Sequence, residues 1–122
     1  MLTVETLGVL GRLILASDRR EICGFLLIGA SGAQEFRAVN NLERWPDSFL
    51  VSDVATGRIH RDAERLGLRV AAFVHSHPIG VELSDLDAIG MKASAIPWIV
   101  VTLGSSGVHF KVHTSQATEA SR

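Results

Sequence analysis

The sequence has little of several features that define whole classes of protein. It holds a single cysteine, Cys23, so no disulfide can form within the chain, and a cytoplasmic location is the natural expectation. Its 12 lysine and arginine residues nearly balance its 13 aspartate and glutamate residues, for a net charge of -1. That balance argues against a nucleic-acid binder that works through bulk attraction to phosphate.

Long apolar runs are also missing. No stretch approaches the roughly 18 consecutive apolar residues of a membrane span. Residues 1–18 lack the basic start and the small-residue cleavage site of a signal peptide. The chain has 122 residues, 47% of them hydrophobic, which is enough for one domain with its own core. We expect a soluble domain over residues 1–113, followed by a flexible polar tail at 114–122.

Hydrophobic periodicity predicts helices and strands that alternate only in part. One helix is expected after Thr3, a second from Ser52 or Asp53 to Gly67, and a third over about 84–94. Strands are expected at 21–29, 34–39, 49–51, 68–74, 98–103 and 108–112. This order favours a mixed α+β fold, in which helices flank a mixed β-sheet, over an all-parallel α/β sheet.

His75-Ser76-His77 is the most informative local pattern. On a strand, residues i and i+2 point to the same face, so both imidazoles can converge on one ion. The strand ends at Pro78, which would place the pair at a sheet edge where a site can open to solvent. The alternative is two polar residues at a strand end, because a structural zinc site usually needs four protein ligands.

Ser84-Asp85-Leu86-Asp87 follows after a short loop and has two interpretations. A serine followed three residues later by an acid resembles a capping box, with Ser84 as the N-cap of a helix. Asp87 in that first turn could also reach a metal ion and complete a set of two histidines and one aspartate. Three protein ligands leave one position for water, which is the layout of a catalytic zinc site.

Glu21 stands just before a strongly apolar stretch, residues 22–28, and a carboxylate there needs a reason. One interpretation is a solvated strand end. The other is a general base that takes a proton from the attacking water and passes it to the leaving amine. Zinc lowers the pKa of a bound water to about 7, so a carboxylate is an adequate acceptor.

Together these residues form the pattern E … H-S-H-P … S-x-x-D, and here the sequence resembles the JAMM (MPN+) zinc metallopeptidases. Their motif is an upstream glutamate, then H-x-H, then S-x-x-D. The likeness also includes the E-x-C-G turn into the first apolar strand and Asn40-Asn41, and it covers roughly residues 2–113. It implies a JAMM/MPN-like fold with a cytidine-deaminase-like architecture.

One spacing departs from that family. Its members usually have seven residues between the second histidine and the serine, whereas 78–83 supplies six. The usual spacing falls on Asp85 and Ala88, which cannot supply a serine–aspartate pair. Either the loop is one residue shorter or Asp85 replaces Asp87 as a ligand. We favour the shorter loop, because loops absorb single deletions readily.

The resemblance implies a role for each matching residue. His75, His77 and Asp87 would bind Zn²⁺, and Glu21 would act as general base and acid. Ser84 would donate a hydrogen bond to the oxyanion that forms when water attacks the carbonyl. The implied reaction is hydrolysis of the amide bond after the C-terminal Gly-Gly tail of a ubiquitin-like protein.

Two other functions remain open. A related hydrolase would release cysteine or a C-terminal extension from a sulfur-carrier protein, and an MPN-type scaffold would bind a partner without a metal. The chain lacks long insertions and so looks like the compact bacterial type, some members of which act with phage-tail assembly or antiphage conjugation systems. Neither nucleic acid nor a membrane is expected as a partner, and the oligomeric state is open.

The other notable side chains are expected to have structural roles. Cys23 is interpreted as a small buried residue, which could bind a metal only if it lay beside His75. His60 is expected to be solvated on its helix. His109 and His113 share a face of the last strand, but no nearby acid supports a second metal site. The two tryptophans, Trp45 and Trp98, are expected to pack in the core. The two acids, Glu82 and Asp85, are expected to line the rim of the cleft.

Overall fold

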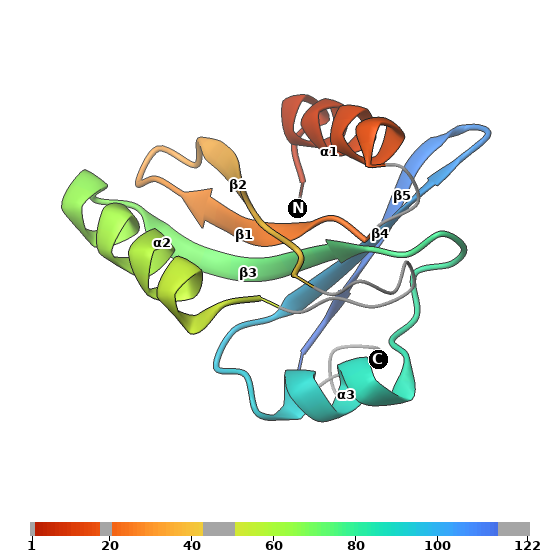
Figure 1. The fold of residues 1–122 in the computed structure, drawn as a ribbon. Helices are drawn as coiled ribbons and strands as arrows, with labels where there is room; N and C mark the ends of the chain where they lie inside the picture. The colour runs from red at the N-terminus through yellow and green to blue at the C-terminus, as the bar shows by residue number, and fades with distance from the viewer. Residues whose placement is uncertain (1, 18–20, 43–50, 115–122) are drawn as a thin grey trace.

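A mixed sheet with helices on both faces forms the centre of the molecule (Figure 1). The computed structural model describes residues 2–17, 21–42 and 51–114. The elements are α1 (Val4–Ala16), β1 (Cys23–Ile28), β2 (Gln34–Val39), α2 (Asp53–Leu66), β3 (Arg69–Ser76), α3 (Asp85–Lys92), β4 (Trp98–Gly104) and β5 (Gly107–His113). The expected mixed α+β architecture is therefore confirmed. Three expectations fall outside the described residues, wholly or in part. They are the packing of Trp45, the strand at 49–51, of which only Val51 is described, and the tail, of which only Thr114 is described.

The strand order places the histidine pair at the end of a central strand. The five strands run β2-β1-β3-β4-β5, and β3 is antiparallel to β1 but parallel to β4. The parallel pair needs a crossover, which α3 and its loops supply. In register, His75 lies between Cys23 on β1 and Val100 on β4. The edge expected at Pro78 is thus the carboxyl end of the middle strand.

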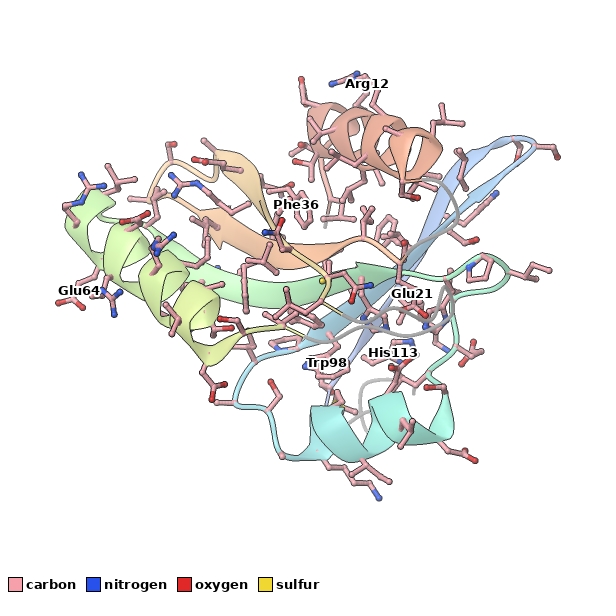
Figure 2. All side chains as sticks on the ribbon, viewed as in Figure 1. Arg12, Glu21, Phe36, Glu64, Trp98 and His113 are labelled. Atoms are coloured by element: carbon pink, nitrogen blue, oxygen red, sulfur yellow. The ribbon has the colours of Figure 1, made fainter. Side chains whose placement is uncertain are left out.

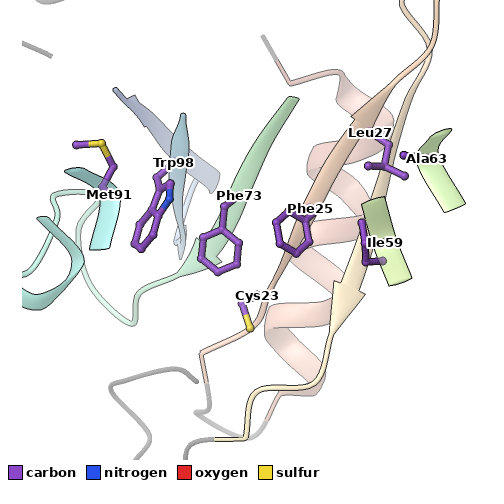
Figure 3. Close-up of a cluster of buried hydrophobic side chains, with 8 residues drawn as sticks. All are labelled: Cys23, Phe25, Leu27, Ile59, Ala63, Phe73, Met91 and Trp98. Carbon is purple, nitrogen blue, oxygen red and sulfur yellow. The ribbon is translucent and has the colours of Figure 1, made fainter. Parts of the chain in front are cut away.

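Side chains alternate along the strands and divide the core into two layers. On one face, a cluster that includes Leu10, Leu26, Val74 and Ile99 packs under α1. The other face packs against α2 and α3 through the cluster drawn in Figure 3, which contains Cys23, Phe25, Leu27, Ile59, Ala63, Phe73, Met91 and Trp98. Because Phe73 and His75 are two residues apart on β3, the histidine belongs to the face covered by α2 and α3.

The helix ends expected from the sequence are confirmed. The side chain of Thr3 accepts the N–H of Thr6 at the start of α1, and the side chain of Ser52 accepts the N–H of Ala55 at the start of α2. Gly67 ends α2 with φ 71°, in the left-handed region that glycine adopts without strain. None of the helices in the described ranges is long and apolar enough to cross a membrane.

Gly24 allows β1 and β2 to approach each other closely. A Cβ at residue 24 would lie 2.2 Å from the carbonyl oxygen of Arg37 and 2.9 Å from the Cα of Ala38. Both atoms belong to the backbone of β2 and cannot move aside, so only glycine fits. This contact sets the start of β1, just after Glu21, tightly against β2.

Candidate metal centre

Backbone pairing on both sides holds His75 and His77 in place. His75 is fully buried in β3, and the N–H of His77 continues the pairing by donating to the carbonyl of Val101 at 2.8 Å. Between them, the hydroxyl of Ser76 accepts the N–H of Ile22 at 2.9 Å, and the N–H of Ser76 donates to the carbonyl of Ile22 at 3.0 Å. The two imidazole centroids lie 4.9 Å apart, on the same face, as the i, i+2 spacing predicts.

Asp87 reaches the same face from the first turn of α3. One carboxylate oxygen, Oδ2, lies 3.1 Å from Nε2 of His75 and 2.9 Å from Nε2 of His77. The same oxygen accepts the N–H of Ser84 at 3.2 Å, while Oγ of Ser84 accepts the N–H of Asp87 at 3.1 Å. The capping box and the contact with both histidines therefore coexist, so the two interpretations of S-x-x-D do not exclude each other.

The six-residue loop brings Asp87, rather than Asp85, to the histidines. Asp87 is 7% exposed, whereas Asp85 lies on the exposed surface of α3. Residues two apart on an α-helix point about 200° apart around its axis, so both cannot face the site. The shorter loop expected from the sequence matches this placement.

Glu21 is buried beside the histidines, which rules out a solvated strand end. Glu21 is 5% exposed. One oxygen of its carboxylate and one ring nitrogen from each of His75 and His77 all lie within 4.8 Å of one another. The side-chain amide of Asn41 donates to the backbone carbonyl of Glu21 at 2.9 Å, which ties this position to the segment after β2. In the view of Figure 2, Glu21 is labelled near Trp98 and His113, between β3 and α3.

Burial and hydrogen bonding set the protonation of this group. Burial opposes ionisation of Asp87, but the hydrogen bonds from His75 and His77 outweigh it and lower the pKa of the carboxyl. Burial lowers the pKa of His75 against the opposing effect of Asp87. The hydrogen bond to Asp87 raises the pKa of His77 against burial. Near neutral pH, Asp87 is therefore ionised and His75 is neutral, the forms in which both can bind a metal.

The donor set fits a zinc ion. Two atoms bound to one tetrahedral zinc ion at 2.0–2.1 Å lie roughly 3.3 Å apart. Oδ2 of Asp87 is within a few tenths of an ångström of that distance from each Nε2. These lengths are also ordinary for hydrogen bonds. The charges favour a cation, because two buried carboxylates, Glu21 and Asp87, each lie beside the same two histidines.

Ser84 lies at the exposed rim of this group. Its hydroxyl accepts the N–H of Asp87 and, as a hydroxyl, still carries one proton that it can donate. A cavity of about 460 Å³ adjoins Glu21, between the carboxyl end of α1 and the facing ends of β1 and β2. The cavity is lined by Glu21 but not by His75, His77 or Asp87, so it adjoins the group at the glutamate alone.

Cys23 does lie beside His75 in the strand register, but it does not join the ligand set. Its sulfur is 3.8 Å from the carbonyl oxygen of Val39. Burial, helped by the charge of Glu21, raises the pKa of the thiol to about 12. Among the described residues, the group of donors within 4.8 Å of one another contains Glu21, His75 and His77 but not Cys23. The expectation of a small buried residue is met.

The other histidines lie apart from one another. His60 is exposed on α2, as expected, with its ring edge against Phe25 at a centroid distance of 5.8 Å. On β5, the ring nitrogen of His109 contacts the hydroxyl of Ser106 at 3.0 Å, whereas His113 is buried. Among the described residues, these two histidines do not join a common ligand set.

Sequence reasoning missed three side chains that hold the loop between His77 and Ser84. The hydroxyl of Thr102 donates to the carbonyl of Pro78 at 3.3 Å, and Nε2 of His113 donates to the carbonyl of Val81 at 2.8 Å. Nζ of Lys111 lies 2.9 and 3.1 Å from the two carboxylate oxygens of Glu82. No local motif marks these residues, because only the pairing of β4 and β5 brings them under the loop. Glu82 and Asp85 are exposed at the rim, as expected.

Comparisons with known proteins address the family and the fold. A family model described as prokaryotic homologs of the JAB domain matches residues 4–118. The solution structure of a protein from Desulfitobacterium hafniense is 16% identical, with a TM-score of 0.71, and the match covers 89% of this chain and 87% of that chain. A second solution structure, of a protein from Salinibacter ruber, is 20% identical, with a TM-score of 0.59 and coverage of 90% and 78%. At these identities the structures show a shared fold alone. No curated protein matches the chain.

Proposed function

This chain belongs to the prokaryotic homologues of the JAB domain, as its JAMM-like pattern predicts, and from that membership we propose that it is a zinc-dependent peptidase. One observation carries the proposal: a single oxygen of Asp87 lies 3.1 and 2.9 Å from the Nε2 atoms of His75 and His77, with the carboxylate of Glu21 beside them. Two imidazoles and one carboxylate, with a further position for water, are the donor set of hydrolytic zinc sites.

Each residue then has a distinct part in the reaction. His75, His77 and Asp87 hold the ion, which when bound lowers the pKa of a water to about 7 and so supplies a nucleophile at neutral pH. Glu21 accepts the proton as the water attacks the carbonyl carbon, and delivers it to the leaving amine. Ser84 donates a hydrogen bond to the oxyanion, which is worth about 3–4 kcal/mol in the transition state.

As the substrate, we propose the amide bond after the Gly-Gly tail of a ubiquitin-like protein. Glycines have no side chains, so an extended tail can enter a narrow approach and pair with the edge of a sheet. Two features support this choice. β2 is the outermost strand on one side of the sheet, and the cavity between the ends of β1 and β2 adjoins Glu21.

The first test is the zinc content of the purified chain. We expect about one zinc per chain in the wild type and a sharp fall in Asp87→Ala, because that change removes the oxygen that both histidines contact. Asp85→Ala is the matched control, since Asp85 is an exposed acid on the same helical turn, and its zinc content should equal the wild type. A wild type that binds no zinc even when metal is supplied would favour the MPN-type scaffold.

Substrates with Gly-Gly tails then separate the two hydrolase functions. An isopeptide to lysine tests deconjugation, and a tail joined to cysteine or to a short peptide tests release from a sulfur carrier. We expect the isopeptide to be cleaved faster. Faster release of cysteine would assign the chain to the sulfur-carrier reaction, and zinc binding without cleavage of any of the three would contradict the peptidase proposal.

A further inference from the structure

We propose that His113, at the end of β5, is a positioning residue for the metal centre: it holds the loop 78–83, which connects His77 to Asp87. The inference rests on the proposed function, because it concerns the same metal site. It assigns a role to a buried histidine outside the E … H-x-H … S-x-x-D pattern.

His113 is a well-defined anchor. The residue is 6% exposed, and its Nε2 is 2.8 Å from the carbonyl oxygen of Val81, in the middle of the loop. A carbonyl can only accept, so Nε2 carries the proton of this hydrogen bond. The backbone of His113 pairs with Trp98 across the β4–β5 ladder, so the sheet fixes the donor in space.

The anchored carbonyl lies next to a contact of the ligand His77. A backbone hydrogen bond to Glu82, the residue after Val81, is among the interactions that raise the pKa of His77. Two residues after Glu82, Ser84 begins α3 and forms the capping box with Asp87. A shift of the loop at Val81 would therefore move a contact of His77 and the start of the helix that carries Asp87.

Within the described residues, two further contacts reach the loop from β4 and β5, and both are weaker than that of His113. Lys111 and Glu82 form an exposed pair, with side chains 50% and 72% accessible, and such pairs contribute little. The hydroxyl of Thr102 reaches Pro78 at 3.3 Å, close to His77 but far along the chain from Asp87. Partners that hydrogen-bond directly to a metal ligand typically change metal affinity by about 10- to 100-fold. His113 acts through the loop that joins two ligands, and we expect its effect to fall within the same range.

Asparagine and glutamine provide a matched pair of substitutions. The amide nitrogen of glutamine reaches the place of an imidazole Nε2, whereas that of asparagine stops near Nδ1 and cannot contact Val81. In competition with a chromophoric chelator, we expect His113→Asn to lower the zinc affinity of the full chain by about 10- to 100-fold. His113→Gln should recover most of it. His109→Asn, at an exposed position on the same face of β5, should bind zinc like the wild type.

A second readout does not depend on the metal. In the zinc-free chain, the amides of Asp87 and Ala88 donate to the side chain and the carbonyl of Ser84, respectively. Their hydrogen exchange should become faster in His113→Asn, and should stay at the wild-type rate in His113→Gln and His109→Asn. If the wild type binds no zinc, the proposed function is wrong, but the exchange rates still decide whether His113 positions α3.

The proposal is overturned if folded His113→Asn keeps the wild-type zinc affinity and the wild-type exchange at Asp87 and Ala88. It is also overturned if the glutamine variant loses as much affinity as the asparagine variant. If His113→Asn does not fold, Thr102→Val removes the Pro78 anchor without changing the size of the side chain. We then expect Thr102→Val to show a smaller change in the same direction. Unchanged zinc affinity and unchanged exchange in Thr102→Val would overturn the proposal that anchors on the sheet hold this loop.

Discussion

Gly90 on α3 lies directly against the indole of Trp98. A Cβ at residue 90 would come within 2.9 Å of the ring, closer than real Cβ contacts. Trp98 in turn packs edge-on against His75, with ring centroids 5.4 Å apart and planes at 84°. The distance between α3 and the sheet is therefore set by an aromatic ring that also supports a candidate metal ligand, and Asp87 sits on the same helix.

Gly90→Ala should push α3 away from the sheet and weaken the metal site. Trp98 is buried in the core cluster and cannot swing aside, so we expect a loss of about 1–3 kcal/mol in the free energy of unfolding, typical of overpacking. Zinc affinity should fall as well, since α3 carries Asp87. Chemical denaturation and chelator competition measure the two effects.

Gly8→Ala is the matched control for that change. Gly8 is also inside a helix, but there a Cβ would meet only the end of the Arg12 side chain at 3.5 Å, an ordinary contact. Alanine should stabilise α1 by up to about 1 kcal/mol, as in helix interiors generally. If Gly90→Ala is as stable as Gly8→Ala and binds zinc equally well, α3 is not held against Trp98 as described.

Glu21→Gln should abolish hydrolysis while zinc stays bound. Glutamine has nearly the same shape but cannot accept a proton, so we expect a fall of about 10²- to 10⁴-fold in kcat, the usual contribution of a general base. The measurements are the turnover of a Gly-Gly substrate and the zinc content of the same sample. Glu64→Gln, at an exposed glutamate on α2, should keep its activity. Full activity in Glu21→Gln would assign the proton transfer to another group.

Cys23 should resist alkylation in the folded chain. Burial raises its pKa to about 12, so only about one thiol in 10⁴ is ionised at pH 8, and the thiolate is the reactive form. We expect labelling by iodoacetamide to proceed at the rate at which the chain unfolds, and to become fast in denaturant. Rapid labelling under native conditions would mean that the start of β1 opens locally.

Local patterns predicted those parts of the site that depend on neighbours in the chain. The i, i+2 spacing of His75 and His77 and the capping box of Ser84 follow from strand and helix geometry alone. The strand order could not be predicted in this way. The pairing of distant segments leaves no periodic signal in the sequence. For example, β3 is a central strand because it pairs with β1 on one side and, after the crossover through α3, with β4 on the other.

His113 shows the same limit at the level of one residue. His109 and His113 are four residues apart on one strand, and this spacing correctly predicted that both side chains lie on the same face of the strand. It does not tell which segment of the chain packs against each histidine. The structure places Val81 over His113 and leaves His109 exposed beside Ser106. The path of the loop 78–83 decides between the two environments, and that path depends on where α3 packs against Trp98.

Zinc should stabilise the folded chain, because the ligands come together only on folding. Residues 75–77 and 87 lie on different elements, so the unfolded chain offers the ion no equivalent site. At a free zinc concentration 100 times the dissociation constant, the gain is about 2.7 kcal/mol. For a domain of this size, that gain corresponds to a rise of roughly 10 °C in Tm. A chelator should reverse it, and Mg²⁺, which prefers oxygen ligands, should produce no rise.

His77→Gln should lose the rise in Tm, whereas His60→Gln, at an exposed position on α2, should keep it. An equal rise in His77→Gln would mean that the ion binds elsewhere, and the convergence of His75, His77 and Asp87 would then be an ion-paired cluster that stabilises the fold without a metal.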